Sequence, residues 1–204
     1  MRTIKHILSL MTAILMVAAP STAFAQAPTG VRGEVANYDA GILTVKTKSG
    51  EMVRARLSSP PAVAAIVPAA LADVKTGAYV GVAVKPQDDG GFEAMEVHIF
   101  PEAARGTGEG TRPYDLAPGS IMTNGNVAVV VDAVAGPTLT VSFAAGKQQI
   151  HVAPATPIVA IVSGDAGDLK VGADVIVRGL TLGDDGVYSA RRVLVGRDGL
   201  KLPM

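Results

Sequence analysis

Apolar and polar residues alternate in short runs along most of this chain. In the run ILTVKT, which starts at Ile42, Leu43 and Val45 share one face, while Thr44 and Lys46 share the other. A period of two is typical of strands that are buried on one side only. Turn-forming words such as DAG, KSG, KTG and DDGG separate the runs. Strands are therefore expected at residues 31–38, 42–47, 52–57, 79–85 and 92–99 of the first half.

Several short sequence motifs of the first half, called words below, recur in the second half in the same order. LTV at Leu43 recurs at Leu139, and AIV at Ala65 recurs at Ala160. The longer words DVKTGAYVGV and DDGGFEAMEV return as DLKVGADVIV and DDGVYSARRV. The spacing is 95 or 96 residues throughout. Such a constant spacing predicts a tandem duplication of one small domain.

Each predicted copy contains three strands, an irregular stretch with a short helical turn, and two further strands. This order is typical of an OB-like five-stranded barrel, and a pair of open sandwiches is the alternative. Leu71 and Leu169 are expected to plug the barrels, and Gly77 and Gly172 to turn the chain into the fourth strand. The last strand of each copy breaks strict alternation, which predicts a β-bulge.

The first residues have the layout of a secretory signal peptide. Arg2 and Lys5 give a basic start, residues 7–19 are apolar and uncharged, and a small-x-small triplet ends at Ala25. A membrane anchor needs about 20 apolar residues, and this apolar run is shorter. Cleavage after Ala25 is therefore expected, and it predicts a periplasmic protein without a transmembrane segment after cleavage.

The predicted fold class is all-β, with two tandem OB-like five-stranded barrels joined by an ordered strap, after a cleaved signal peptide. The expected domains are the signal peptide at residues 1–25, the first barrel at 26–99, the strap at 100–125 and the second barrel at 126–204.

Composition and charge remove several function classes. The chain has 18 basic and 18 acidic residues, and loss of Arg2 and Lys5 leaves the mature protein slightly acidic. Nucleic acids and anionic membranes favour a basic stripe, so no nucleic-acid partner is expected. The sequence has no cysteine, which excludes a disulfide framework, thiol chemistry and Cys-based zinc sites.

The words LTVKTKSG, DVKTGAYVGV and DDGGFEAMEV, together with a G-x-V motif, resemble the bacterial exported domains of unknown function 5666. The resemblance covers roughly residues 31–99 and 127–195. It is looser in the second copy, where Val129 is aligned with Gly33. The resemblance implies an OB-like barrel, often repeated, in the cell envelope. It implies no activity, because the shared words are turn and core residues.

The stretch between the copies, residues 98–126, is not repeated and is richer than a flexible linker needs to be. Its apolar residues predict an ordered strap packed on both barrels: Phe100, Tyr114, Leu116, Ile121 and Met122. Its arginines are expected near the crease between the barrels, paired with Glu102, Glu109 or Asp115. One interpretation is a structural clamp. The other is a ligand or partner site, aimed by a rigid scaffold and formed by Arg105, Arg112, Tyr114, Asp115 and Asn124.

Candidates for catalysis and metal binding are few. Glu96 and His98 would share a strand face, but zinc and copper sites usually need three or four ligands, so they are weak metal candidates and no metal or cofactor is predicted. Ser120 lies in no nucleophile-elbow pattern, and GTGEG lacks the Lys-Ser/Thr of a phosphate loop. The acidic pairs that start at Asp88 and Asp184 fit a repeated turn better than a glycosidase pair. No catalytic residue and no enzyme activity is predicted.

Two hypotheses about function follow. The first is a non-catalytic binding or scaffolding module of the cell envelope, whose partner is an envelope protein or a glycan. The alternative is a periplasmic protein that binds a small ligand or a metal in the crease between the barrels.

Overall fold

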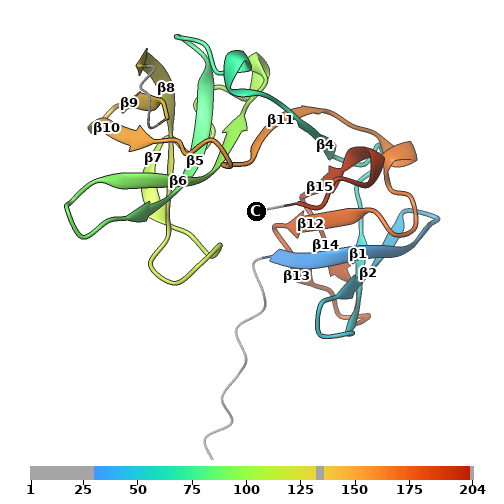
Figure 1. The fold of residues 1–204 in the computed structure, drawn as a ribbon. Helices are drawn as coiled ribbons and strands as arrows, with labels where there is room; N and C mark the ends of the chain where they lie inside the picture. The colour runs from blue at the N-terminus through green and yellow to red at the C-terminus, as the bar shows by residue number, and fades with distance from the viewer. Residues whose placement is uncertain (1–29, 132–135, 203–204) are drawn as a thin grey trace, which may run out of the picture.

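The computed structural model describes residues 30–131 and 136–202, which form an all-β protein (Figure 1). The predicted signal peptide lies outside the described residues. The strands are β1 (Gly30–Asp39), β2 (Ile42–Thr47), β3 (Met52–Arg56), β4 (Val63–Pro68), β5 (Tyr79–Pro86), β6 (Phe92–Ile99), β7 (Gly110–Pro113), β8 (Ile121–Val131), β9 (Thr138–Phe143), β10 (Gly146–His151), β11 (Ile158–Ser163), β12 (Asp174–Arg178), β13 (Thr181–Leu182), β14 (Tyr188–Ser189) and β15 (Arg192–Gly196). The 3-10 helices are η1 (Leu71–Asp73), η2 (Glu102–Ala104), η3 (Ala166–Asp168) and η4 (Arg197–Gly199). None of the helices in the described ranges is long and apolar enough to cross a membrane.

The strands predicted for the first half are confirmed as β1, β2, β3, β5 and β6, to within one residue at each end. Their alternation has the expected effect, since β2 buries Leu43 and Val45 and exposes Lys46. The predicted helical turns are η1 and η3. The bulge predicted in the last strand of the first copy lies opposite the step from Ala83 to Val84 in β5, whereas β15 pairs with β12 without a register shift. The strands β4 and β11 were missed because their residues were expected to be irregular, and β7 was missed because its residues were assigned to the strap.

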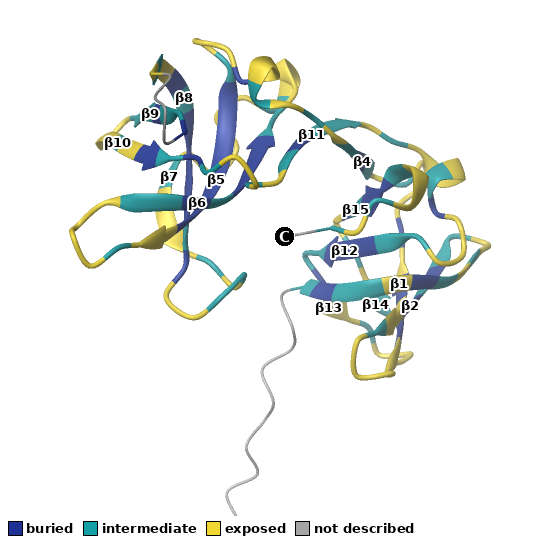
Figure 2. Ribbon diagram, viewed as in Figure 1, coloured by how far each residue is buried: buried dark blue, intermediate teal, exposed yellow. Residues whose placement is uncertain are grey.

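The strands form two barrels, and each barrel takes strands from both halves of the chain. In the first, called the β8 barrel, β8, β9 and β10 pair in order, β10 meets β6, and β5 closes a five-stranded ring between β6 and β8. In the second, called the β1 barrel, β1, β2 and β3 pair in order, β12 joins β1 to β15, and β14 pairs with β3. The two barrels lie side by side with separate buried interiors (Figure 2).

This exchange of strands corrects the expected domain boundaries. Residues 26–99 and 126–204 were each expected to form one barrel. Instead, the core of the β1 barrel contains Leu43 and Val193, and the core of the β8 barrel contains Val82 and Leu139. The physical reason is that β4 and β11 are extended, so they carry the chain from one barrel to the other instead of folding it back (Figure 1).

The strands β4 and β11 also connect the barrels to each other. They pair antiparallel, with Ile66 opposite Ile161 at the centre of the ladder. On their outer edges, β4 pairs with β15 and β11 pairs with β6. All fifteen strands therefore belong to one continuous sheet, and the two barrels share a hydrogen-bonded bridge that restrains their relative position.

Matching hydrogen bonds seal the two barrels at the positions that the sequence words align. Gly77 donates its backbone N–H to the carbonyl of Val127, and Gly172 donates to that of Val35, both at 2.8 Å. Both glycines have a positive φ, as expected for residues that turn the chain into a strand. The predicted plug is confirmed for Leu169, which is buried in the β1 barrel. In the β8 barrel the matching residue is Val74, which is buried, whereas Leu71 is only partly buried against that core.

The alignment of Val129 with Gly33 was wrong, because Gly125 takes the place of Gly33. A Cβ atom on Gly33 would lie 2.2 Å from the carbonyl oxygen of Lys46, and one on Gly125 would lie 2.3 Å from that of Ser142. Lys46 and Ser142 are themselves 96 residues apart in the matching strands β2 and β9. The error arose because the connection after β8 is longer than the turn after β1, which shifts the spacing on its two sides.

Candidate ligand-binding cleft between the barrels

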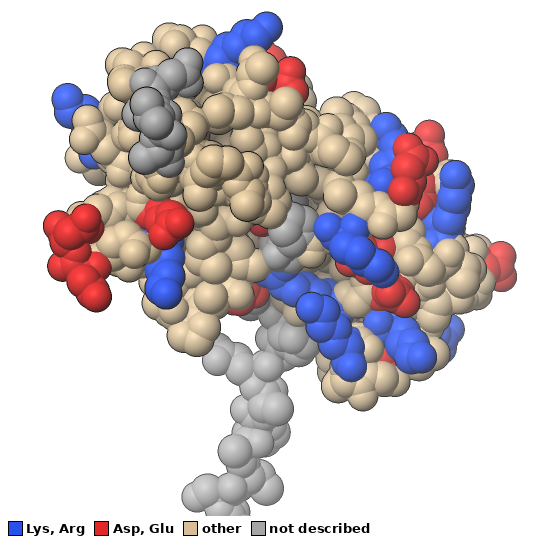
Figure 3. Space-filling view, in the orientation of Figure 1, with Lys and Arg blue, Asp and Glu red and all other residues tan. Residues whose placement is uncertain are grey.

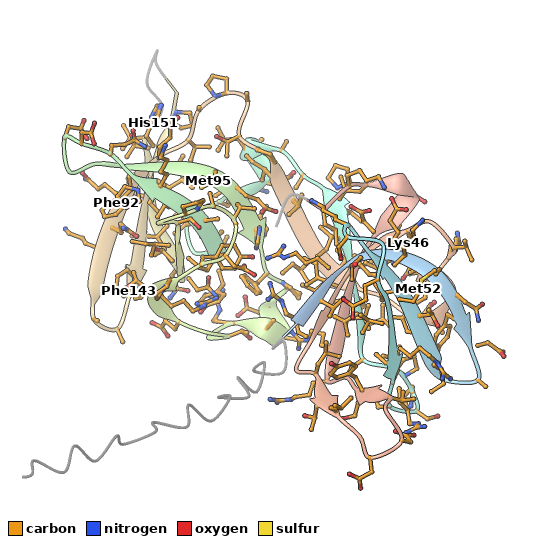
Figure 4. All side chains as sticks on the ribbon, turned by 90° about the horizontal axis from the view of Figure 1, so that it is seen from below. Lys46, Met52, Phe92, Met95, Phe143 and His151 are labelled. Carbon is orange, nitrogen blue, oxygen red and sulfur yellow. The ribbon has the colours of Figure 1, made fainter. Side chains whose placement is uncertain are left out.

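A cleft of about 890 Å3 lies between the two barrels. Side chains of both barrels fill the region around it in Figure 4, where Lys46 and Met52 mark the β1 barrel and Phe92, Phe143 and His151 mark the β8 barrel. The lining residues are His98, Phe100, Met122 and Asn124 from the β8 barrel, Thr107, Arg112, Pro113, Tyr114 and Asp115 from the strap, Ile161 from β11, and Arg178, Gly179, Arg191, Arg192 and Leu194 from the β1 barrel.

The wall on the β8 barrel is arranged around Gly81 of β5. Gly81 pairs with His98 on one side and with Asn124 on the other, so the three positions form one row across the sheet. A Cβ on Gly81 would lie 2.8 Å from Oδ1 of Asn124 and 3.0 Å from the ring of Phe100. The missing side chain therefore makes the space in which Asn124 and Phe100 lie over the strand.

Asn124 presents a buried acceptor at this wall. The residue is 1% exposed, and its Nδ2 donates to the carbonyl oxygen of Thr107 at 2.8 Å. That bond fixes the orientation of the amide, because a flipped side chain would direct Oδ1 at another oxygen. Oδ1 has no hydrogen-bond partner among the described residues. A buried polar atom without a partner is costly. Oδ1 lies just beneath the cleft surface, so a ligand that donates to it would recover that cost once a small side-chain movement opens Oδ1 to the cleft.

Glu96 and His98 form a buried pair at the same wall. They are 0% and 3% exposed, and Nε2 of His98 lies 2.7 Å from Oε1 of Glu96. The contact is short, but it is too poorly aligned to count as a hydrogen bond. His98 lines the cleft, whereas Glu96 is not among the lining residues. The sequence correctly placed both side chains on one face, and the strand curvature and packing bury them.

The opposite wall is basic. Arg178 at the end of β12 pairs in register with Arg192 at the start of β15, and Arg191 precedes it. The strap adds Arg112, whose Nη1 donates to the carbonyl of Gly108 at 2.7 Å. Within the described residues, none of these four arginines takes part in an ion pair. Arginines gathered in one hollow create a positive potential that favours an anion.

The backbone holds one of these arginines in place. Gly179 has a φ of 67°, and a Cβ there would lie 2.7 Å from Cδ of Arg191. The side chain of Arg191 therefore packs directly over this glycine. Lys and Arg side chains are also numerous over the β1 barrel on the face seen in Figure 3.

A metal site is not supported by this geometry. Across the described residues, no group of three or more His, Cys, Asp or Glu side chains could hold a metal ion. Glu96 and His98 are only two ligands, and the four arginines of the cleft would repel a cation. The arrangement therefore suits an anion better than a metal.

The strap behaves differently from the prediction in two respects. It connects β6 to β8, which belong to the same barrel, so it does not join the barrels along the chain. It also does not place Arg105 in the cleft. Arg105 pairs with Glu102 through Nη2 and Oε2 at 2.6 Å, donates to Asn126, and lies 5.9 Å from the ring centroid of Tyr79. These contacts hold Arg105 on the outer face of the β8 barrel.

Other parts of the strap do reach the second barrel. Oδ1 of Asp115 accepts a hydrogen bond from Arg32 of β1 at 2.7 Å. Tyr114 packs against a small apolar cluster that includes Ile66 and Ile176. Of the five apolar anchors expected in the strap, Met122 is buried and the others are partly buried. The strap therefore contacts both barrels, as expected, and it forms one end of the cleft.

The first part of the strap has a counterpart at the end of the chain, although no repeated motif marks it. η2 is followed by Arg105, which contacts Asn126 and the ring of Tyr79. η4 is followed by Lys201, which pairs with Glu34 and Asp174 at 2.7 and 3.0 Å. Arg105 and Lys201 are 96 residues apart. Arg105 and Lys201 thus make contacts at matching places in the two barrels, although the residue types differ.

Ser120 is not available as a nucleophile. Its buried hydroxyl contacts the carbonyl oxygens of Tyr114 and Ala117 at 2.9 and 2.8 Å, and it accepts from the N–H of Ala117. These bonds shape the turn of the strap. The acidic pairs also serve turns, since Asp89 accepts from Gly91 and Asp185 from Val187.

Comparison with protein families finds a match for the second half of the chain. Residues 130–193 match the model described as Domain of unknown function (DUF5666). No curated protein and no solved structure matches the chain. The matched stretch begins in β8 and ends in β15, so its first strands lie in one barrel and its last strands in the other. The DUF5666 match supports the resemblance for that stretch.

Sequence reasoning identified four cleft residues of the strap region and missed three arginines. Arg178, Arg191 and Arg192 lie within the DUF5666 match, in words that were interpreted as core and turn. A signal was present. At the matching positions of the first half, Ala83, Met95 and Glu96 stand where the second half has these three arginines. A change from neutral and acidic to basic residues on an outer strand face indicates a surface that differs in function between the halves.

Proposed function

We propose that this chain is an exported, non-catalytic binding protein that holds a small anionic ligand in the cleft between its barrels. The observation that carries the proposal is the cluster of four cleft arginines without an acidic partner in the described residues. A volume of about 890 Å3 lies within the range of small-molecule sites, about 300–1,000 Å3.

Export is supported by the signal-peptide pattern that ends at Ala25, and we infer a periplasmic location. The five-stranded closure of the β8 barrel supports an OB-like fold, and the recurring words support an origin as two copies of one domain. In this account the two copies exchanged halves, and the exchange created the cleft.

A scaffolding module that binds an envelope protein or a glycan is the second candidate. Scaffolding needs an extended contact surface, whereas the arginines and the buried acceptor of Asn124 converge on one hollow. The convergence favours the small-ligand function.

Binding can be tested by NMR titration of the mature protein with inorganic phosphate and with acetate. Amide shifts should change around the cleft, and the double variant R178Q/R192Q should lose them. R54Q is the matched control, because Arg54 is an exposed arginine of β3 outside the cleft. Shifts scattered evenly over the surface, or equal binding by R178Q/R192Q and R54Q, would contradict the proposal.

A further inference from the structure

The two walls of the cleft present opposite chemistry to a ligand. The β1 barrel contributes Arg178, Arg191 and Arg192, which donate hydrogen bonds and carry positive charge. The β8 barrel contributes the unpartnered Oδ1 of Asn124, a buried acceptor. A ligand that satisfies both walls has an anionic group at one end and a hydrogen-bond donor at the other.

A hydroxyl group suits the donor end of the ligand better than an ammonium group does. Asp115 is engaged by Arg32, and Glu96 lies behind His98, so no free carboxylate among the described lining residues would balance an ammonium. The arginines would repel it. A neutral hydroxyl can donate to Oδ1 of Asn124 without that repulsion.

Two aromatic rings also line the cleft. Phe100 is held edge-on against Tyr79, with ring centroids 5.5 Å apart and planes at 64°, and both Phe100 and Tyr114 line the cleft. Rigid aromatic side chains offer flat apolar contact area at low entropic cost. The C–H face of a sugar ring is a suitable partner for such a surface.

From these features we infer that the ligand is an acidic sugar, with its carboxylate or phosphate against the arginines and its hydroxyl groups against Asn124. This inference rests on the proposed function and specifies it. Carboxylate and phosphate sugars share the chemistry that the cleft recognises, and the two probes below separate them. The buried acceptor of Asn124 would make the cleft select sugars over simple anions, because a site built to pair with a hydroxyl rejects ligands that lack one.

The test uses isothermal titration of the mature full-length protein with five probes: galacturonate, glucose 6-phosphate, galactose, acetate and inorganic phosphate. At least one acidic sugar should bind about fivefold or more tightly than acetate, phosphate and galactose, since each added hydrogen bond strengthens binding about fivefold. The stronger of the two acidic sugars identifies the anionic group.

Two variants assign the sugar advantage to its residue. N124A removes the acceptor, and it should reduce acidic-sugar binding to the level of acetate while acetate binding persists. T111A is the matched control, because Thr111 is an exposed strap residue outside the lining. NMR spectra of both variants report whether they fold.

The outcomes separate this inference from the proposed function. Acetate and phosphate binding with no gain for either acidic sugar would overturn the sugar inference and leave the anion site intact. Galactose binding as strong as that of the acidic sugars would also overturn it. No binding of any probe in the millimolar range would overturn both.

Discussion

Ile66 and Ile161 lie opposite each other at the centre of the β4–β11 ladder, 95 residues apart in words that read AIV in both halves. When two matching residues meet at the centre of an antiparallel ladder, their strands are related by a local two-fold axis. The ladder therefore places the outer faces of both barrels around that axis. Those faces carry Glu96 and His98 on one side and the matching Arg192 and Leu194 on the other.

Cleavage of the strap should leave the molecule intact. A site for a sequence-specific protease, inserted at the exposed Pro118–Gly119 turn, would cut the chain between its two halves. Both fragments should elute together at the size of the intact protein, because each barrel contains strands of both. They should separate only in denaturant. Release of two separately folded domains would restore the expected boundaries at residues 99 and 126.

Gly33 and Gly125 should tolerate no side chain. G33A and G125A bring a methyl group within 2.2 and 2.3 Å of a backbone carbonyl oxygen, so the strands must move apart. We expect each variant to lower the free energy of unfolding by about 2 kcal/mol or more. G91A is the control, since its nearest neighbour is the side chain of Asp89 at 3.0 Å, and it should cost less than about 1 kcal/mol. Urea denaturation measures all three. An equal effect in G91A would contradict the close approach.

The buried Glu96–His98 pair should reduce stability relative to an apolar pair. Both carboxylate oxygens of Glu96 and Nε2 of His98 are buried and have no hydrogen-bond partner among the described residues. Replacing both residues with apolar ones can be neutral or stabilising, whereas removing one of them leaves the other buried and unsatisfied at a cost of about 1–3 kcal/mol. The double variant E96L/H98L should therefore be at least as stable as the unmodified protein, and H98L alone less stable than both. Thermal unfolding at neutral pH gives the order. A double variant less stable than H98L would indicate that the pair stabilises the fold.

Asp168 gives the fold a pH-dependent contribution. Hydrogen bonds from Arg197 lower the pKa of Asp168 below its ordinary value. Because the folded-state pKa is lowered, the stabilisation is present above the unfolded pKa of about 3.9 and is lost as pH falls through the lower folded value. D168N should cost about 1 kcal/mol at pH 7, and the difference should shrink below about pH 4. D88N, an exposed turn variant, should show no such dependence; a constant D168N deficit would refute the linkage.

Local structure was predictable from the sequence because it depends on neighbouring residues. The alternation in ILTVKT determines which face of β2 is buried, and Gly77 marks the turn into β5. The partners of the strands were not predictable in the same way. The backbone of Val35 could bond to the segment around Gly77 or to the one around Gly172, because the motifs DVKTGAYVGV and DLKVGADVIV that contain these glycines are nearly the same. The choice depends on whether β4 and β11 are extended, which their short apolar words leave open.

The candidate site was also predictable where it depends on local sequence and not where it depends on strand partners. Arg112, Tyr114, Asp115 and Asn124 were predictable because the strap is rich in charged and aromatic residues, which a linker does not need. Arg105 was misplaced because its distance along the chain from Tyr79 gives no sign of their contact. Arg178, Arg191 and Arg192 come from strands that were assigned to the other barrel, and only the exchange brings them opposite His98.

The cleft depends on the β4–β11 ladder, and cysteines at its centre test the ladder directly. The chain has no cysteine, so the variant I66C/I161C carries a single pair. Opposed residues in an antiparallel ladder have Cα atoms about 4.5–5.5 Å apart, within reach of a disulfide or a short bismaleimide. A cross-link within one molecule is expected, and it should keep both fragments joined in denaturant after the strap is cut. Single-cysteine variants control for cross-links between molecules. Fragments that separate in denaturant, or cross-links between molecules alone, would contradict the exchange of strands and the cleft built on it.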